Sequence, residues 1–300
     1  MVTSFLSDVE RTTLPCGRIA ACGVALLSFL RGLPLLFSDR PKTPLRILCI
    51  MAFDTVLALR GADRMTSRTR QTLAALLDFG ACANKELDGK EFSLREYQAM
   101  RRLLAGTRAG ELIEDYADRL SNLENERPAP NGGVGQFCKA QRYREEVVRL
   151  SLAMIAATVL DNTSIDDGIQ ATQCEEDLDM LYRIVMLCQI IDDVLDFETD
   201  VAAGLPSFLT AHVSLPDALA LTEEARRQYA GSADLLSSRH LFPFRVALAG
   251  VSVVAKAVIF GRWLWMGIAR VSRVFMGRRT RVSFGRGAAT TLKRRKLAHE

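Results

Sequence analysis

Apolar residues recur at spacings of three and four along nearly the whole chain, and few stretches alternate with the two-residue period of a strand. This pattern predicts amphipathic helices joined by short links, which fit a single all-α helical bundle. The predicted helices cover residues 47–60, 66–87, 93–105, 111–126, 142–160, 175–201 and 217–236, and a late apolar helix begins at Arg245. The main predicted breaks are residues 128–135, 161–168 and 204–216.

The size and composition are those of a folded chain with a substantial core. Of 300 residues, 49% are apolar and 25% are charged, which excludes a disordered or low-complexity chain. The seven cysteines form no C-x-x-C pair, which argues against a disulfide scaffold and a structural zinc site. We therefore expect a cytoplasmic protein with an N-terminal apolar helix and lead-in (1–40), one helical domain (41–270) and a basic tail (271–300).

Charge is distributed unevenly along the chain. Residues 251–299 contain twelve Lys and Arg and no Asp or Glu, whereas the first 250 residues contain 27 basic and 34 acidic residues. A basic tail suits a polyanion, and here it predicts peripheral contact with an anionic membrane and no specific nucleic acid. The alternative is a tail that is merely solvated.

Two apolar segments raise the question of a membrane span. Residues 19–30 are too few to cross a bilayer, which takes about 20 residues. Residues 246–268 are long enough, but Lys256 and Arg262 interrupt them, and a central charge costs about 3 kcal/mol on insertion scales. The sequence therefore favours a buried or membrane-surface helix over a true span.

One segment carries an acidic stripe. On a helical projection with Asp192 at zero, Asp196 falls at about 40°, Gln189 at about 60° and Asp200 at about 80°. Asp193 lies about 100° from Asp192, at the edge of the stripe. The opposite face is apolar and is predicted to pack against the core.

Carboxylates stacked at i, i+4 and i+8 repel one another unless a cation offsets their charge. Mg²⁺ is commonly bound by a few carboxylates together with the phosphates of a substrate. The stripe therefore predicts a site where a diphosphate binds through metal, with Asp192, Asp193, Asp196 and Asp200 as candidate ligands. The alternative is an acidic helix face that is only solvated.

The segment from Gln189 to Asp196 reads Gln-Ile-Ile-Asp-Asp-Val-Leu-Asp, and it is followed by Asp200 and by Gly204-Leu-Pro206. It resembles the second aspartate-rich motif of class I isoprenoid synthases, including the trans-prenyl diphosphate, squalene/phytoene and bacterial large-terpene synthases. The resemblance implies an all-α fold whose central cavity binds a prenyl diphosphate, with Mg²⁺ as cofactor. It also implies that Asp192 and Asp196 are catalytic, because metal-assisted loss of diphosphate would generate an allylic carbocation.

Such a fold has a first acidic motif facing the second. The best candidate places Asp78, Cys82 and Glu86 at i, i+4 and i+8, with Asp78 and Glu86 as metal ligands. The alternative is an ordinary helix end before a turn at Gly89. The elongating synthases carry Lys after the glycine where this chain has Leu205, so the resemblance favours cyclisation or head-to-head condensation over chain elongation.

A diphosphate also needs basic partners. Arg144 and Arg149 open a predicted helix and could face the cavity, since arginine suits bidentate phosphate contacts. Together with Gln189 they form the predicted diphosphate-binding set. The alternative for both arginines is surface ion pairing with Glu145 and Glu146. Further candidates are Arg101 and Arg102.

Three functional hypotheses follow. The first is a Mg²⁺-dependent terpenoid synthase, a lyase or transferase that ionises a prenyl diphosphate and then cyclises or condenses it. The second is a non-catalytic protein of the same fold that binds a lipid or a partner. The third is a membrane-associated helical protein whose acidic face is incidental. A homodimer is compatible with all three.

Overall fold

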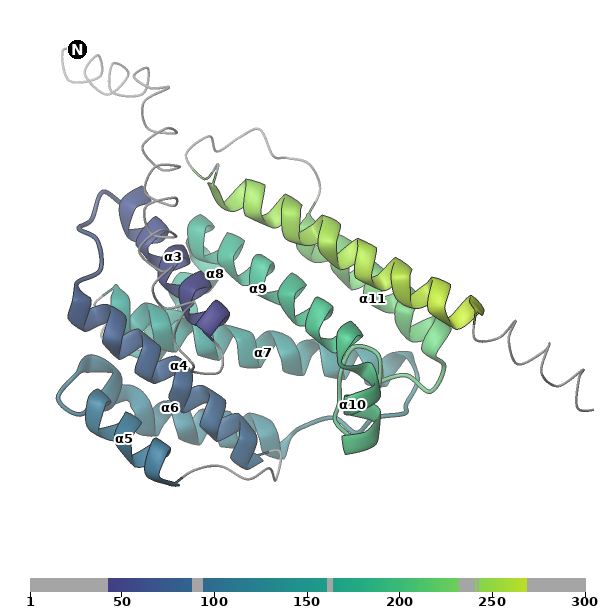
Figure 1. Ribbon diagram of the computed structural model, residues 1–300, viewed down its shortest axis with the longest axis horizontal. Coiled ribbons are helices and arrows are strands. Elements are labelled where there is room, and N and C mark those ends of the chain that lie inside the picture. Colours follow the sequence, from purple (N-terminus) through teal and green to yellow (C-terminus); the bar gives the residue numbers. More distant parts are fainter. Residues whose placement is uncertain (1–42, 88–93, 161–163, 232–240, 242, 269–300) are drawn as a thin grey trace, which may run out of the picture.

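The computed structural model describes residues 43–87, 94–160, 164–231, 241 and 243–268 (Figure 1). In these ranges the chain is helical and has no strand, only an isolated bridge between Gly132 and His212. The all-α prediction is confirmed. The predicted N-terminal apolar helix (1–40) and basic tail (271–300) lie outside the described residues.

Figure 1 shows the helices of the described residues in the order in which they follow one another along the chain. They are α3 (Thr43–Leu59), α4 (Ser67–Leu87), α5 (Leu94–Leu104), α6 (Arg108–Asn125), α7 (Val134–Val159), α8 (Ile165–Cys174), α9 (Glu176–Leu195), α10 (Phe197–Ala203), α11 (Leu215–Ala230) and an unlabelled last helix, Pro243–Ile268.

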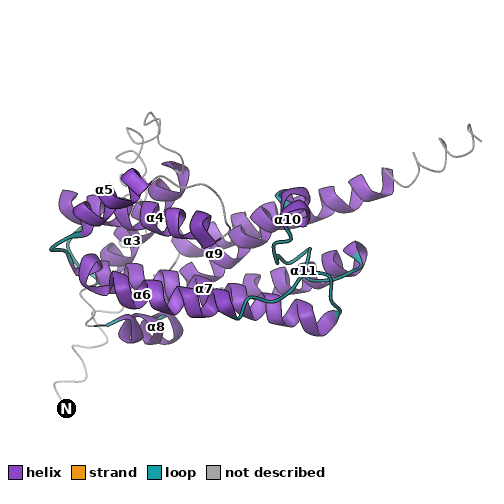
Figure 2. Ribbon diagram, turned by 90° about the horizontal axis from the view of Figure 1, so that it is seen from below, coloured by secondary structure: helices purple, strands orange, loops and turns teal. Residues whose placement is uncertain are grey.

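Helix α7 is at the centre of the bundle. It packs against α4, α6, α8 and α9, and Figure 2 shows α8 on one side of it and α4 on the other. Six consecutive residues, from Leu152 to Ala157, are buried. A helix that is buried on every side must have neighbours all round, so this turn of α7 fixes where the surrounding helices can lie.

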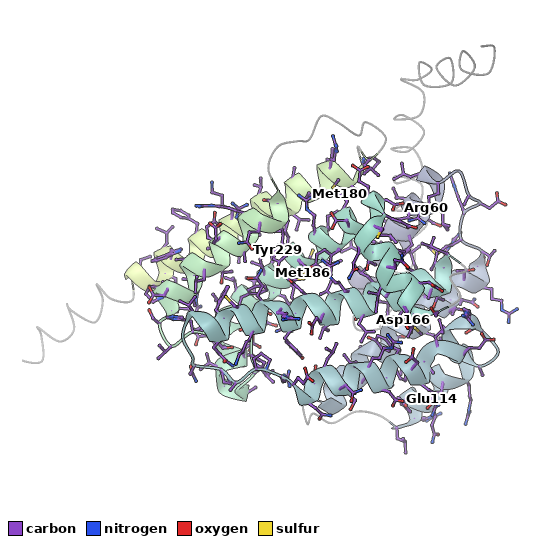
Figure 3. All side chains as sticks on the ribbon, turned by 180° about the vertical axis from the view of Figure 1, so that it is seen from behind. Arg60, Glu114, Asp166, Met180, Met186 and Tyr229 are labelled. Atoms are coloured by element: carbon purple, nitrogen blue, oxygen red, sulfur yellow. The ribbon has the colours of Figure 1, made fainter. Side chains whose placement is uncertain are left out.

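Helix α9 is fastened at its N-terminal end by an ion pair to α3. Arg60 directly follows α3 and is labelled in Figure 3. It donates to both carboxylate oxygens of Asp177 at 2.8 Å and also contacts Glu175. Met186, one turn from the motif, is fully buried. This anchoring sets the position of the acidic residues at the other end of α9.

Several predicted element boundaries were wrong; the helix predicted for 217–236, for example, ends at Ala230. Helix α7 begins at Val134 instead of 142, because the apolar positions Phe137 and Ala140 are buried and extend its core-facing stripe. The predicted polar break at 161–168 contains the start of α8, where the Ser164 hydroxyl caps the helix by accepting from the Asp167 backbone N–H. The single helix predicted for 175–201 is divided into α9 and α10 at Asp196.

Gly168 allows α8 to lie directly against α7. A Cβ placed on Gly168 would come within 2.5 Å of the Ala153 carbonyl oxygen on α7. We expect Gly168→Ala to lower the free energy of unfolding by about 1–3 kcal/mol, because backbone would have to move. Chemical denaturation measures this. The control is Gly80→Ala in α4, where no atom lies within 4 Å and the gain in helix propensity should stabilise by about 0.5–1 kcal/mol. Equal effects of the two variants would contradict the prediction.

Candidate functional site

The acidic motif lies where α9 ends and α10 begins. Asp196 has φ −90° and ψ 8° and separates the two helices, and α10 turns away from the axis of α9 (Figure 1). The backbone hydrogen bonds from Asp196 N to Asp192 O (2.8 Å) and from Asp200 N to Asp196 O (2.9 Å) persist across the break. The prediction that all three aspartates share one helix was therefore wrong for Asp200. Helix α10 has no fully buried residue, and its partly buried Phe197 packs against the core.

The aspartates of the motif differ sharply in exposure. Asp192 and Asp196 are exposed, Asp200 is half-buried, and Asp193 is buried with 2% of its surface exposed. The helical projection placed Asp193 at the edge of the stripe, but the structure places it inside the bundle. The exposed pair and the buried residue therefore have different surroundings.

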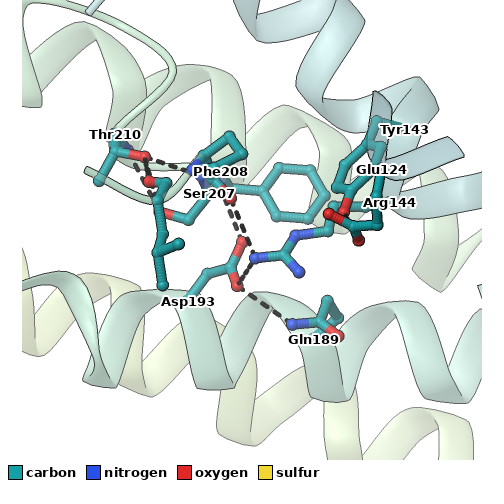
Figure 4. Close-up of polar contacts among 10 residues, drawn as sticks. Glu124, Tyr143, Arg144, Gln189, Asp193, Ser207, Phe208 and Thr210 are labelled. Atoms are coloured by element: carbon teal, nitrogen blue, oxygen red, sulfur yellow. Dashed lines mark hydrogen bonds and ion pairs between the residues drawn. The ribbon is translucent and has the colours of Figure 1, made fainter. Parts of the chain in front are cut away.

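Asp193 is the centre of a polar cluster that joins three segments (Figure 4). Its Oδ1 accepts from Arg144 Nη2 on α7 at 3.0 Å and from the Gln189 amide on α9 at 3.1 Å. Its Oδ2 accepts from the backbone N–H of Phe208 at 2.8 Å. Arg144 Nη2 also donates to the Pro206 carbonyl at 3.1 Å. Both oxygens of Asp193 are thus committed to protein donors, as a buried carboxylate requires.

The segment after α10 is a buried turn that sequence reasoning missed. Ser207, Phe208 and Leu209 have at most 1% of their surface exposed. Thr210 Oγ1 accepts from Ser207 N at 2.7 Å and donates to the Leu205 carbonyl at 2.6 Å, so side chains satisfy the buried backbone. The sequence feature that could have indicated this buried turn is the pair Ser207 and Thr210, two small hydroxyl residues in an apolar run directly after the motif.

Burial shifts the acidity of the inner carboxylates. It raises the pKa of Asp193, and Arg144 together with the hydrogen bonds from Phe208 and Gln189 opposes that rise. Burial and the nearby Asp193 raise the pKa of Asp200 to about 6, while Ser207 and Arg144 act in the opposite direction. Burial is therefore the main reason why the charged forms of these two carboxylates are disfavoured.

The raised pKa of Asp200 makes stability depend on pH. The folded state binds this proton more tightly than the unfolded chain, whose pKa is near 3.8, so the stabilisation is complete below about pH 4 and is lost as pH rises through 6. We expect Asp200→Asn to melt progressively higher than wild type between pH 4 and 7, measured by thermal denaturation without divalent metal. The control is Asp118→Asn, at an exposed position of α6. A difference in melting temperature that does not change with pH would contradict the prediction.

The structure separates the two predicted diphosphate-binding arginines. Arg144 lies with Gln189 and Asp193, whereas Arg149 stacks over the ring of Tyr182, 3.9 Å from the ring centre. Five residues along a helix amount to a rotation of about 140°. The structure therefore brings Arg144 to the motif and Arg149 to Tyr182, which lies nearer the N-terminal end of the same helix, α9.

The predicted first motif lies on α4. Asp78 is half-buried and Cys82 is buried, so this face of α4 is directed inward. Glu86 is in the last turn of α4, and its side chain lies outside the described residues. Helices α4 and α9 both pack against α7, so the two acidic segments are arranged around the same central helix.

Other features of the described chain do not add ligands to the motif. In the ranges that the structure describes, no three His, Cys, Asp or Glu side chains converge in a group that could hold a metal ion. A pocket of about 560 Å³ lies between the end of α6 and the start of α7, lined by residues such as Leu123, Gln136 and Tyr143. None of the four aspartates of the motif lines this pocket.

No protein-family model, no curated protein and no solved structure matches this chain. What the protein does is therefore inferred from its own residues and contacts.

Proposed function

We propose that the protein is a Mg²⁺-dependent terpenoid synthase of the class I isoprenoid type. It would ionise a prenyl diphosphate with release of diphosphate, and cyclisation or condensation would follow. The observation that carries the proposal is the end of α9, where Asp192 and Asp196 are exposed one turn apart and Asp200 has a pKa of about 6. Burial, and to a smaller extent neighbouring carboxylates, disfavour the charged form of Asp200, and a bound cation would favour it.

The residues present fit Mg²⁺ that is shared with a substrate. Mg²⁺ usually keeps several waters and takes only one or two carboxylates from the protein, the remaining ligands coming from phosphates. Asp192 and Asp196 offer exposed oxygen donors of this kind, and Asp200 stands beside them. When bound, the metal would act as a Lewis acid that stabilises the departing diphosphate. In this mode of binding, the protein does not need to supply a complete set of metal ligands before the substrate is bound.

The buried cluster would position these ligands. Asp193 joins the end of α9 to Arg144 on α7 and to the turn at Phe208. Because both of its oxygens accept protein hydrogen bonds, its role in the proposal is to orient the α9 terminus, and the metal ligands are its exposed neighbours. Arg144 and Gln189 keep Asp193 in place and put positive and amide donors close to the proposed diphosphate position.

The proposal extends to α4 through Asp78 and Glu86. These two residues would supply the carboxylates of the first motif, on a helix that packs against the same central helix as α9. Leu205, in place of the lysine of elongating enzymes, favours a substrate that reacts alone or with a second copy of itself.

The test is direct incubation of the full-length protein with C10 to C35 prenyl diphosphates and Mg²⁺. We expect release of inorganic diphosphate and a product that extracts into organic solvent, and both should disappear when EDTA is added. The control substrate is the matching prenyl monophosphate, which has fewer oxygens for the metal. Tight Mg²⁺-dependent binding of a diphosphate without any turnover would support the non-catalytic hypothesis instead, and neither binding nor turnover would end the proposal.

A further inference from the structure

The last helix, Pro243–Ile268, has one face packed on the bundle. Its buried residues follow a three- and four-residue spacing: Phe244, Leu248, Ser252, Ala255 and Ile259. This is the stripe by which an amphipathic helix attaches to a core. In Figure 1 the helix runs along α11.

Polar contacts fasten that inner face at two levels. Arg226 of α11 is 9% exposed and donates from Nη1 to the Ser252 hydroxyl at 2.6 Å. Arg262, ten residues further along, contacts Glu198 of α10 and lies 4.6 Å from the ring centre of Phe197. These contacts hold the helix lengthwise against the bundle.

The outer face is almost entirely apolar. Its exposed large side chains are Val246, Val253, Val254, Phe260, Trp263, Leu264, Trp265 and Ile268. Lys256 is the single charged residue among the exposed positions between 243 and 268. By length and composition alone the helix could cross a membrane. Its most apolar 18-residue stretch has a mean hydropathy of 1.8, and 22% of that stretch is buried. An exposed patch of this extent marks an interaction surface.

We infer that this outer face binds the surface of an anionic lipid bilayer, with the helix lying flat. Charge complementarity identifies the occupant, because residues 251–299 contain twelve Lys and Arg and no acidic residue. Basic residues next to an apolar helix favour anionic lipid by about 1 kcal/mol for each well-placed charge. Trp263 and Trp265 lie in the last turns, and tryptophan is enriched where protein meets the headgroup region.

The flat orientation follows from the fastened inner face. To cross the bilayer, the helix would have to give up the contacts of Ser252 and Arg262 and take Lys256 and Arg262 into hydrocarbon. A surface helix keeps those contacts and buries only the apolar side. The inference does not depend on any catalytic activity, since none of the motif aspartates takes part in it.

The chain provides its own probe, because Trp263 and Trp265 are its only two tryptophans. We expect tryptophan emission to shift to shorter wavelength on titration with phosphatidylcholine vesicles that contain phosphatidylserine. The shift should be much smaller with phosphatidylcholine alone, and high salt should reduce it by screening the basic residues. Equal shifts with both vesicle types, or no shift with either, would overturn the inference.

A matched pair of variants separates this surface from apolar exposure in general. Leu264→Glu places a charge on the outer face and should weaken vesicle partitioning about tenfold. Leu103→Glu in α5, where the leucine is similarly exposed (60% against 53%), should bind vesicles as wild type does. Circular dichroism confirms that both variants fold, and partitioning of Leu103→Glu is followed with its unchanged tryptophans. Equal partitioning of the two variants would overturn the inference.

A second copy of the chain is the competing occupant of the outer face. Self-association would shift the emission with protein concentration in the absence of vesicles, and sedimentation would show a dimer. That result, with no added shift on vesicles, would replace the bilayer by a second copy.

Discussion

The Asp193→Ala variant is expected to lose about 3–5 kcal/mol of unfolding free energy, the cost of breaking a buried ion pair by removing one partner. The substitution leaves the Arg144 guanidinium without its carboxylate and the buried N–H of Phe208 without its acceptor. Both groups lie between α9 and the following turn, so the turn from 205 to 211 should loosen with them. Urea denaturation followed by circular dichroism measures the loss.

Asp192→Ala is the matched control, one residue away on the same turn of α9 but exposed. It should change the free energy of unfolding by less than about 0.5 kcal/mol, as surface substitutions usually do. The double variant Arg144→Met/Asp193→Ala should lose less unfolding free energy than the sum of the losses of the two single variants, because the two residues share an interaction. Similar losses for Asp192→Ala and Asp193→Ala would show that Asp193 is not the anchor of the motif.

The largest effect on activity is expected from the exposed pair. Asp192→Asn and Asp196→Asn should each lower diphosphate release by at least about 100-fold, the size of effect seen when a single group that stabilises developing charge is removed. Each substitution deletes one anionic oxygen ligand and leaves the side-chain volume almost unchanged. Steady-state release of inorganic diphosphate at saturating Mg²⁺ measures the effect.

Stability separates this result from misfolding. Without metal, removing one of two like charges at i, i+4 should leave the free energy of unfolding unchanged or raise it by about 0.2–0.5 kcal/mol. Both variants should therefore melt at nearly the same temperature as wild type. Asp118→Asn, an exposed aspartate of α6, should retain full activity. If Asp192→Asn left both product formation and Mg²⁺-dependent diphosphate binding unchanged, the exposed pair would be a solvated surface and the proposed function would fall.

The helices of the bundle could be predicted because each depends on the spacing of apolar residues that are close together in the sequence. The spacing of apolar residues predicts both ends of α3, α4 and α6, and the start of α9, to within a few residues. The errors occurred where the pattern was interrupted by polar residues that cap a helix, as at Ser164, or where a buried stripe extends into a glycine-rich loop, as before Phe137.

The candidate site was predictable only in part, for a physical reason. A helical projection gives angles about one axis, and it assumed that the axis continues past Asp196. It carries no information on Arg144, which lies 49 residues earlier and pairs with Asp193 only because α7 and α9 pack together. The inward direction of Asp193 and its contact with Phe208 therefore depend on tertiary structure, as does the contact of Arg149 with Tyr182.

Helix α10 has a consequence for how the motif can move. None of its seven residues is fully buried, only Phe197 packs partly against the core, and Arg262 contacts Phe197 and Glu198 from the last helix. Local opening is easiest where few apolar contacts resist it, so amide protons of α10 should exchange with solvent sooner than those of α9. Asp200 then travels with a segment that can open by itself, while Asp192 stays on a helix anchored through Asp193. The acidic motif thus combines one carboxylate on an anchored helix with one on a segment that we expect to open more easily, and under the proposed function a bound diphosphate would bring the two together without unfolding α9.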